Sequence, residues 1–191
     1  STDGGKTWKP SNLIDLGGKG HHGGVTEPTL IELRDGRIWM LIRTNWGEFW
    51  SAYSYDGGKF WRTIQPSGIA ASSAPGMLSR LASGRLILVW NRLYPEGKTE
   101  WPLSGGDGLW SETPVSNHRE ELSIAFSDDD GATTWSEPVV IAHNRDAKEQ
   151  GGRRWLAYPY VFEPQPGRIW LTTMQGGLRI RFDEQDFVAE P

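Results

Sequence analysis

The apolar residues of this chain fall in short runs separated by turn-forming residues. The runs 28–34, 37–44, 49–54 and 60–66 are rich in Ile, Leu, Trp, Tyr and Thr, which favour extended strands. No segment sustains the 3.6-residue apolar period of an amphipathic helix. The pattern therefore predicts an all-β chain in which helix is a minor component.

A short box with the pattern S-x-D-x-G-x-T-W occurs three times, at residues 1–8, 54–61 and 127–135. The second copy has Phe in the Thr place, and the third has one extra residue before its Trp. The first Ser residues of the boxes are separated by 53 and 73 residues, a spacing typical of propellers and solenoids. In such a box the Asp and Ser side chains bind backbone amides and Gly takes a positive φ. We expect the Trp to pack between sheets.

A calcium loop at Asp128–Asp130 is the alternative reading of the third box. An EF-hand loop needs a Glu at its twelfth position, and counting from Asp128 that position holds Val139. The calcium loop is therefore rejected.

A second repeat combines a proline with a Gly-Arg turn that follows eight, nine and eight residues later. The pairs are Pro28 with Gly36, Pro75 with Gly84, and Pro159 with Gly167. Each unit then comprises a strand, a Gly turn, a second strand, a third strand that enters a box, and a fourth. Four antiparallel strands repeated every 50 to 70 residues describe propeller blades. The sequence predicts that residues 1–191 form one partial β-propeller domain of about three four-stranded blades.

The spacing of these repeats places four polar side chains on one face of the predicted propeller. Glu27 and Tyr158 open equivalent first strands, Arg43 ends a second strand, and Arg119 precedes a third. First strands are innermost in a propeller, so Glu27 and Tyr158 are expected near the axis, with the boxes on the opposite face. Paired guanidinium groups bind carboxylates, and a carboxylate beside a tyrosine can accept the phenol proton. The alternatives without a catalytic role are a structural Glu27–Arg43 ion pair, an Arg119 exposed to solvent, and a Tyr158 that packs in the core.

Further candidates lie close to these four in sequence. His118 precedes Arg119 and could form a hydrogen bond to a substrate. Trp46 and Trp50 follow Arg43 and could form a sugar-stacking wall or pack between blades. Residues 17–24, Gly-Gly-Lys-Gly-His-His-Gly-Gly, are expected to form a flexible rim loop near Glu27. The two histidines there lack visible partners for a metal, and no metal or cofactor is predicted.

Composition and charge argue against several classes of function. The 191 residues carry a net charge of −4, which argues against electrostatic wrapping of nucleic acid. No apolar run approaches the roughly 18 residues of a membrane span. Cysteine is absent, so there is no disulfide and no thiolate chemistry, whereas 11 tryptophans suit a repeated structural element or a sugar platform.

The ordered set of these features resembles the sialidase (neuraminidase) superfamily, whose propellers carry such boxes. Segments 27–43, 119–125 and 157–161 are similar to its segments for the glutamate with one arginine, the last arginine, and the tyrosine. The resemblance implies a six-bladed propeller that removes a terminal sialic acid, or a related acidic sugar, from glycoconjugates with retention. Tyr158 would be the nucleophile and Glu27 its base, with Arg43 and Arg119 on the sugar carboxylate.

The chain departs from that family at several places. The family's first arginine and its acid/base Asp precede the boxes, so we expect a C-terminal half that is inactive alone and needs the N-terminal half. A secreted or periplasmic protein is favoured, although no signal peptide is visible. Pro159 replaces the usual Ser, and residues 93–117, with Trp101 and Trp110, are an insertion. A non-catalytic propeller that binds glycans or proteins, or a hydrolase or lyase for another acidic sugar, are the alternatives.

Overall fold

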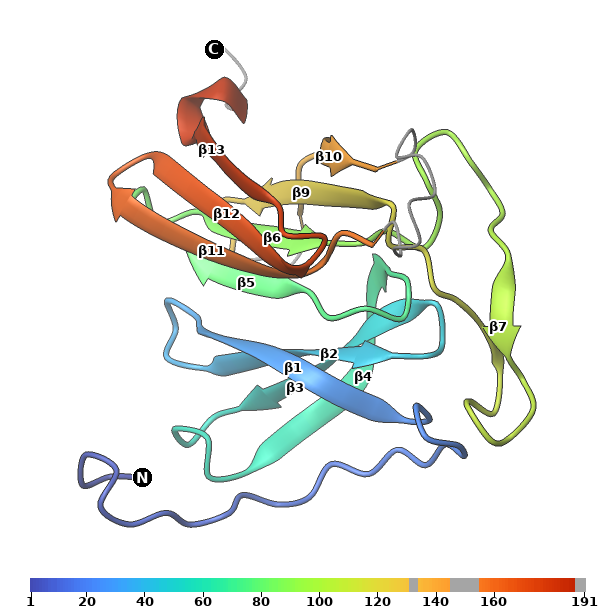
Figure 1. Cartoon of the computed structure of the whole chain (residues 1–191). Coiled ribbons are helices and arrows are strands. Elements are labelled where there is room, and N and C mark those ends of the chain that lie inside the picture. The colour runs from blue at the N-terminus through green and yellow to red at the C-terminus, as the bar shows by residue number, and fades with distance from the viewer. Residues whose placement is uncertain (131–133, 145–154, 188–191) are drawn as a thin grey trace.

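A computed structural model describes residues 1–130, 134–144 and 155–187 of the chain (Figure 1). Its strands form two four-stranded sheets, one three-stranded sheet and a two-stranded hairpin, with a single 3-10 turn, η1 (Glu184–Phe187). The all-β fold expected from the sequence is confirmed. Within the described ranges, no helix has the length and apolar character needed to cross a membrane.

The first sheet has the strand order that the repeat predicts. Its four strands follow one another in space as in the chain, and each pair is antiparallel. They are β1 (Val25–Glu32), β2 (Ile38–Thr44), β3 (Glu48–Ser54) and β4 (Trp61–Ala70). The bounds lie within a few residues of those expected from the apolar runs.

The second sheet also has four antiparallel strands in this order, and the third has three in the described part of the chain. The second sheet consists of β5 (Met77–Arg80), β6 (Leu86–Trp90), β9 (Glu121–Ser127) and β10 (Val139–His143). The third sheet consists of β11 (Ala157–Gln165), β12 (Arg168–Gln175) and β13 (Arg179–Asp183). The 93–117 insertion falls between β6 and β9 and contributes the hairpin of β7 (Leu103–Gly105) and β8 (Pro114–Ser116).

The core lies between the sheets, because the middle sheet is covered on both faces. All five residues of β6 are buried, and successive residues face opposite neighbours. Leu86, Leu88 and Trp90 pack with residues of the first sheet, whereas Ile87 and Val89 pack with residues of the third. The sheets are therefore successive blades of an incomplete β-propeller.

The first two boxes are compact turns, and the second follows the third strand of its sheet, β3. Ser54 Oγ donates to Asp56 at 2.9 Å and accepts the Gly58 amide at 2.9 Å. The same Asp accepts two further backbone amides, and Ser1 with Asp3 repeats the pattern. Residues 131–133 of the third box lie outside the described part of the chain. The boxes are structural turns, as the sequence predicts.

The box tryptophans do not all pack between sheets. Trp61 is buried and Trp135 packs against the first core cluster, but Trp8 is 77% exposed. The expectation is wrong for Trp8 because residues 1–24 contain no strand. The first box therefore has no sheet behind it against which an indole could be buried.

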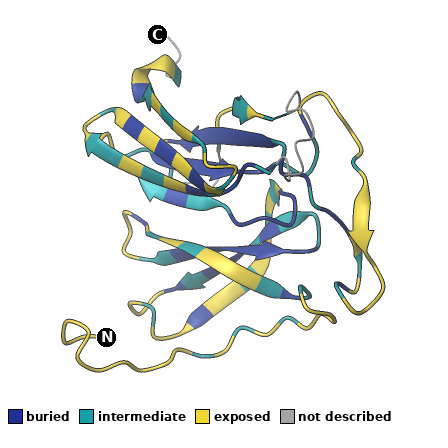
Figure 2. Ribbon diagram, in the orientation of Figure 1, coloured by how far each residue is buried: buried dark blue, intermediate teal, exposed yellow. Residues whose placement is uncertain are grey.

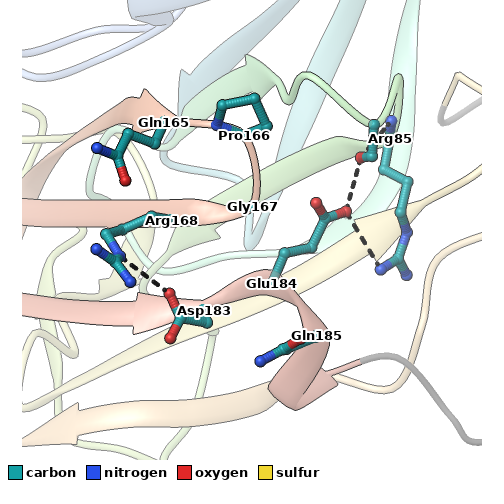
Figure 3. Close-up of a pocket in the computed structure, with 9 residues that line it drawn as sticks. Arg85, Gln165, Pro166, Gly167, Arg168, Asp183, Glu184 and Gln185 are labelled. Carbon is teal, nitrogen blue, oxygen red and sulfur yellow. Dashed lines mark hydrogen bonds and ion pairs between the residues drawn. The ribbon is translucent and has the colours of Figure 1, made fainter.

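At the box end, hydrogen bonds to carboxylates connect each sheet to the next, and we call these contacts clasps. Between the first two sheets, Asp130 accepts the Arg34 amide and the Arg80 guanidinium, each at 2.7 Å. Between the second and third, buried Glu184 accepts the Ser83 hydroxyl at 2.7 Å and lies 3.6 Å from Arg85 (Figure 3). The open pocket around this second clasp is thus lined by charges that already have protein partners.

We expect Asp130→Asn to destabilise the protein by about 1.5–3 kcal/mol at pH 7, because it removes a charged acceptor shared by two sheets. Burial works to raise the pKa of Asp130, but the hydrogen bonds from Arg34 and Arg80 outweigh it and hold that pKa below its usual value. Its contribution is therefore present above the ordinary carboxyl pKa and is lost as the pH falls through the lowered one. Urea unfolding at several pH values measures both effects.

Asp35→Asn is the matched control, since Asp35 is exposed and binds only within its own turn, to Arg37. We expect no change in its unfolding midpoint. Equal midpoints for wild type and Asp130→Asn at pH 7 would show that the clasp does not hold the sheets together.

Candidate active site

The first strands of the three sheets present equivalent residues at one end, each directly before a proline. These residues are Glu27 at the start of β1, Ala74 ahead of β5, and Tyr158 in β11. Glu27 and Tyr158 have positive φ angles of 47° and 59°, which L residues rarely adopt. A strained backbone of this kind costs on the order of 1–3 kcal/mol and persists where the surrounding structure enforces it. The shared conformation is a local feature of the repeat.

Glu27 joins two blades through its two carboxylate oxygens. The Tyr158 hydroxyl donates to Oε1 at 2.9 Å, and Arg43 Nη1 donates to Oε2 at 2.5 Å. Arg43 reaches this place because its neighbour in the register of β1 and β2 is Thr26, one residue from Glu27. The Arg43 side chain is 4% exposed and that of Glu27 39%. Glu27 and Tyr158, although 131 residues apart, thus form one hydrogen-bonded unit.

Ser73 holds the two arginines side by side. Its Oγ accepts hydrogen bonds from Arg43 Nε and Nη2, at 3.2 and 2.8 Å, and its carbonyl accepts one from Arg119 Nη2 at 2.7 Å. The same hydroxyl donates to Asn45 Oδ1 at 2.6 Å. Sequence reasoning missed Ser73, although it occupies the position before the Ala74-Pro75 pair that matches Thr26 and Ala157.

Arg119 lies over the Tyr158 ring, with 5.7 Å between its guanidinium carbon and the ring centroid, and closer, at 4.8 Å, to the Trp155 ring. Burial, followed by the positive charge of Arg43, lowers the pKa of Arg119 to about 10. The group therefore remains protonated at neutral pH. Two guanidinium charges and one carboxylate leave this cluster with an excess positive charge, which favours an anionic ligand.

A pocket of about 270 Å³ opens beside Glu27 and Tyr158 at the first strands. Its remaining walls are mostly apolar, and Pro28, Pro75 and Met77 contribute to them. Ala74, between Glu27 and Tyr158 in the order of the blades, is completely buried and has no side chain beyond Cβ. This small residue leaves the Tyr158 hydroxyl free to reach Glu27.

The structure brings Glu27, Arg43, Arg119 and Tyr158 together at the end of the sheets opposite the boxes, and it places the other candidates differently. His118 is fully buried, with Nδ1 2.9 Å from the Arg92 carbonyl and its ring beside Trp101. Burial lowers the pKa of His118, so the imidazole is neutral at pH 7. In this position His118 anchors the segment that carries Arg119 and is closed to solvent.

Trp46 and Trp50 pack on each other, with ring centroids 5.2 Å apart, and both are half-buried. The Trp46 indole donates to Glu112 of the insertion at 3.1 Å. The pair therefore supports the contact between the first sheet and the insertion. Nothing in the described residues tests a sugar-stacking role. Among those residues, no group of three or more His, Asp or Glu side chains is arranged to hold a metal ion.

The chain is similar to solved structures over part of their length. A crystal structure of a protein of unknown function from Dyadobacter fermentans matches with a TM-score of 0.60 and 19% identity, over 95% of this chain and 42% of that one. The structure of an alpha-L-arabinanase from Penicillium chrysogenum, complexed with arabinobiose, matches with a TM-score of 0.48 and 16% identity, over 85% and 46%. The chain spans less than half the length of either structure.

At the sequence level, no curated protein matches the chain. The family described as the BNR repeat-like domain matches residues 1–172, which include the three boxes, the three sheets as far as Thr172 in β12, and all four clustered side chains. The chain belongs to the BNR repeat-like domain family.

Proposed function

We propose that this cluster belongs to the active site of a glycoside hydrolase of the sialidase type. Its substrate would be a glycoconjugate with a terminal sialic acid or a related acidic sugar, cleaved with retention of configuration. The observation that carries the proposal is the hydrogen bond from Tyr158 to Glu27, flanked by two arginines. Family membership and the resemblance of the ordered segments support it.

Arg43 and Arg119 would hold the sugar carboxylate. A guanidinium group offers a planar pair of donors that matches a carboxylate and does not lose its charge near neutral pH. The two groups already bind the same residue, Arg43 at the Ser73 hydroxyl and Arg119 at the Ser73 carbonyl, and their combined charge exceeds that of Glu27. An incoming carboxylate would balance this excess charge, which is the electrostatic reason for a preference for acidic sugars.

Tyr158 would attack the anomeric carbon while Glu27 takes its proton. A phenol with a reference pKa of about 10 holds its proton at neutral pH unless a base accepts it. Attack forms a bond from the tyrosine oxygen to the sugar and breaks the bond to the leaving group. Water then attacks the anomeric carbon and breaks the glycosyl-tyrosine bond, while Glu27 returns its proton to the departing Tyr158 oxygen. The proton of the water passes to the general acid of the further blades, which gave its own proton to the leaving group in the first step, and two inversions give net retention. Arg119, beside the ring, favours the negative charge that develops on the phenol oxygen.

The Glu27–Arg43 pair suggests how substrate binding would prepare the base. Both Glu27 oxygens are occupied, Oε2 by Arg43 and Oε1 by the Tyr158 hydroxyl. A sugar carboxylate that takes over Arg43 would release Glu27 from this partner. Glu27 would then face Tyr158 alone, so filling of the acid-binding site would free the base for the Tyr158 proton.

The site would be completed by further blades. β6 is buried along its whole length, whereas its repeat equivalent β12 alternates between buried and exposed residues (Figure 2). The exposed face carries Phe162, Trp170 and Met174, at 62%, 50% and 61% exposure. We propose that another sheet of the intact propeller covers this face. Such blades would supply the general acid and a third arginine, which this chain's cluster does not include.

Tyr158→Phe in the full-length protein is expected to lower turnover of a fluorogenic sialoside by at least about 10³-fold, because the nucleophile is lost. Binding of the acidic sugar is expected to persist, since both arginines remain. Tyr55→Phe, in the second box at the opposite end of the sheets and exposed, is the matched control and should retain wild-type turnover. Unchanged turnover in Tyr158→Phe would refute the nucleophile assignment.

Glu27→Gln keeps the size of the side chain but removes the base, so we expect kcat to fall by about 10²–10⁴-fold. Substrates with a very good leaving group should be affected in the same way, because the base acts on Tyr158 and not on the leaving group. Steady-state kinetics with two aryl sialosides of different leaving-group pKa would measure this. Glu32→Gln, at the exposed far end of β1, is the control, and an equal loss there would argue for a general defect in folding.

A further inference from the structure

Two segments outside the blade repeat form a wall next to the arginines. The first is the loop 17–24, and the second is the stretch 109–113 of the insertion. The His21 and His22 amides donate to the Leu109 and Trp110 carbonyls, both at 2.8 Å. Glu112 accepts the Lys19 amide at 3.2 Å. We call residues 17–24 and 109–113 together the rim wall.

The glycines of the loop are required for this contact. A Cβ on Gly20 would lie 2.8 Å from the carbonyl carbon of Trp110 and 2.9 Å from the Ser111 amide nitrogen. Within the loop, a Cβ on Gly24 would lie 2.5 Å from the Gly17 carbonyl oxygen. Such distances leave no room for a side chain. The loop is thus folded tightly against the insertion, in contrast to the flexible rim loop expected from its composition.

Asn45 links the rim wall to the arginine cluster. Its side-chain amide donates to the His22 carbonyl, and its backbone carbonyl accepts the Thr113 hydroxyl at 3.2 Å. Its side-chain oxygen accepts the Ser73 hydroxyl that also binds Arg43. One residue therefore fixes the position of both wall segments relative to the guanidinium groups.

The His22 imidazole lies beside the Trp110 ring, with centroids 5.1 Å apart. Burial lowers the pKa of His22, and the positive charge of Arg43 lowers it further. The His22 carbonyl is bound by Asn45, whose side-chain oxygen accepts the Ser73 hydroxyl that also binds Arg43, so His22 lies next to the arginine cluster. A neutral imidazole has one donor and one acceptor. It can therefore bind a hydroxyl group and does not compete with the arginines for a carboxylate.

We propose that His22 and Trp110 are specificity-determining residues, which contact the hydroxylated, uncharged part of the acidic sugar while the arginines hold its carboxylate. Trp110 offers an aromatic face for the apolar side of the sugar ring, and His22 offers a hydrogen bond to a ring or side-chain hydroxyl. This inference rests on the proposed function of the same site. Neither segment belongs to the strands of the repeat, so the wall can select among acidic sugars without a change in the sheets.

The test compares binding and kinetics of His22→Ala, His22→Gln and His143→Ala in the full-length protein. N-acetylneuraminate and D-glucuronate are the probes for binding by calorimetry, and a fluorogenic sialoside is the probe for kinetics. The loss of one hydrogen bond should weaken binding of the preferred acid by about five- to tenfold in His22→Ala. We expect KM to rise with kcat unchanged, and His22→Gln to recover part of the affinity. Trp110→Leu should weaken binding similarly.

His143→Ala is the matched control, because His143 is an exposed histidine at the end of β10, the outer strand of the second sheet. We expect wild-type affinity there. Unchanged affinity in His22→Ala, or a loss that accompanies a lower unfolding midpoint without rescue by Gln, would overturn the role of the wall but leave the proposed function intact. Failure of the wild-type protein to bind either acid would instead overturn the proposed function and this inference with it.

Discussion

Burial of the middle sheet on both faces is the constraint on which the site depends. Because β6 packs with the first sheet through one set of residues and with the third through the other, the first strands β1, β5 and β11 cannot shift independently. A slip of one residue in any sheet would exchange its buried and exposed sides. The apolar core therefore fixes where Glu27 and Tyr158 meet, although neither belongs to that core.

The same core holds in place two energetically unfavourable features near Glu27 and Tyr158. Two residues adopt positive φ angles directly before prolines, and two guanidinium groups are nearly buried beside one serine. Burial of a charge is costly, and a second like charge nearby adds to the cost; the lowered pKa of Arg119 reflects both. The hydrogen bonds that the two arginines donate to Ser73, Glu27 and Gln175 offset part of it. Strain and excess charge thus occur together where binding of an anion would relieve the charge.

The sequence allowed the repeated part of the molecule to be predicted and left the rest open. Regular spacing of Pro, Gly and the boxes was sufficient for the sheet order and for the convergence of Glu27, Arg43, Arg119 and Tyr158. Ser73 was missed because a serine before Ala-Pro carries no chemical signal until its partners are known. The environment of His118 and the packing of residues 17–24 depend on the insertion, which has no period. Contacts made by unrepeated segments are set by tertiary packing alone.

Ala74 shows what a repeated scaffold makes available to evolution. The three blades carry an acid, a methyl group and a phenol at the position directly before the proline of the first strand. A single codon change at one of these positions would alter the reactive group or the space beside it, while the strands that carry it stay as they are. New chemistries in this architecture can therefore arise blade by blade, without redesign of the framework.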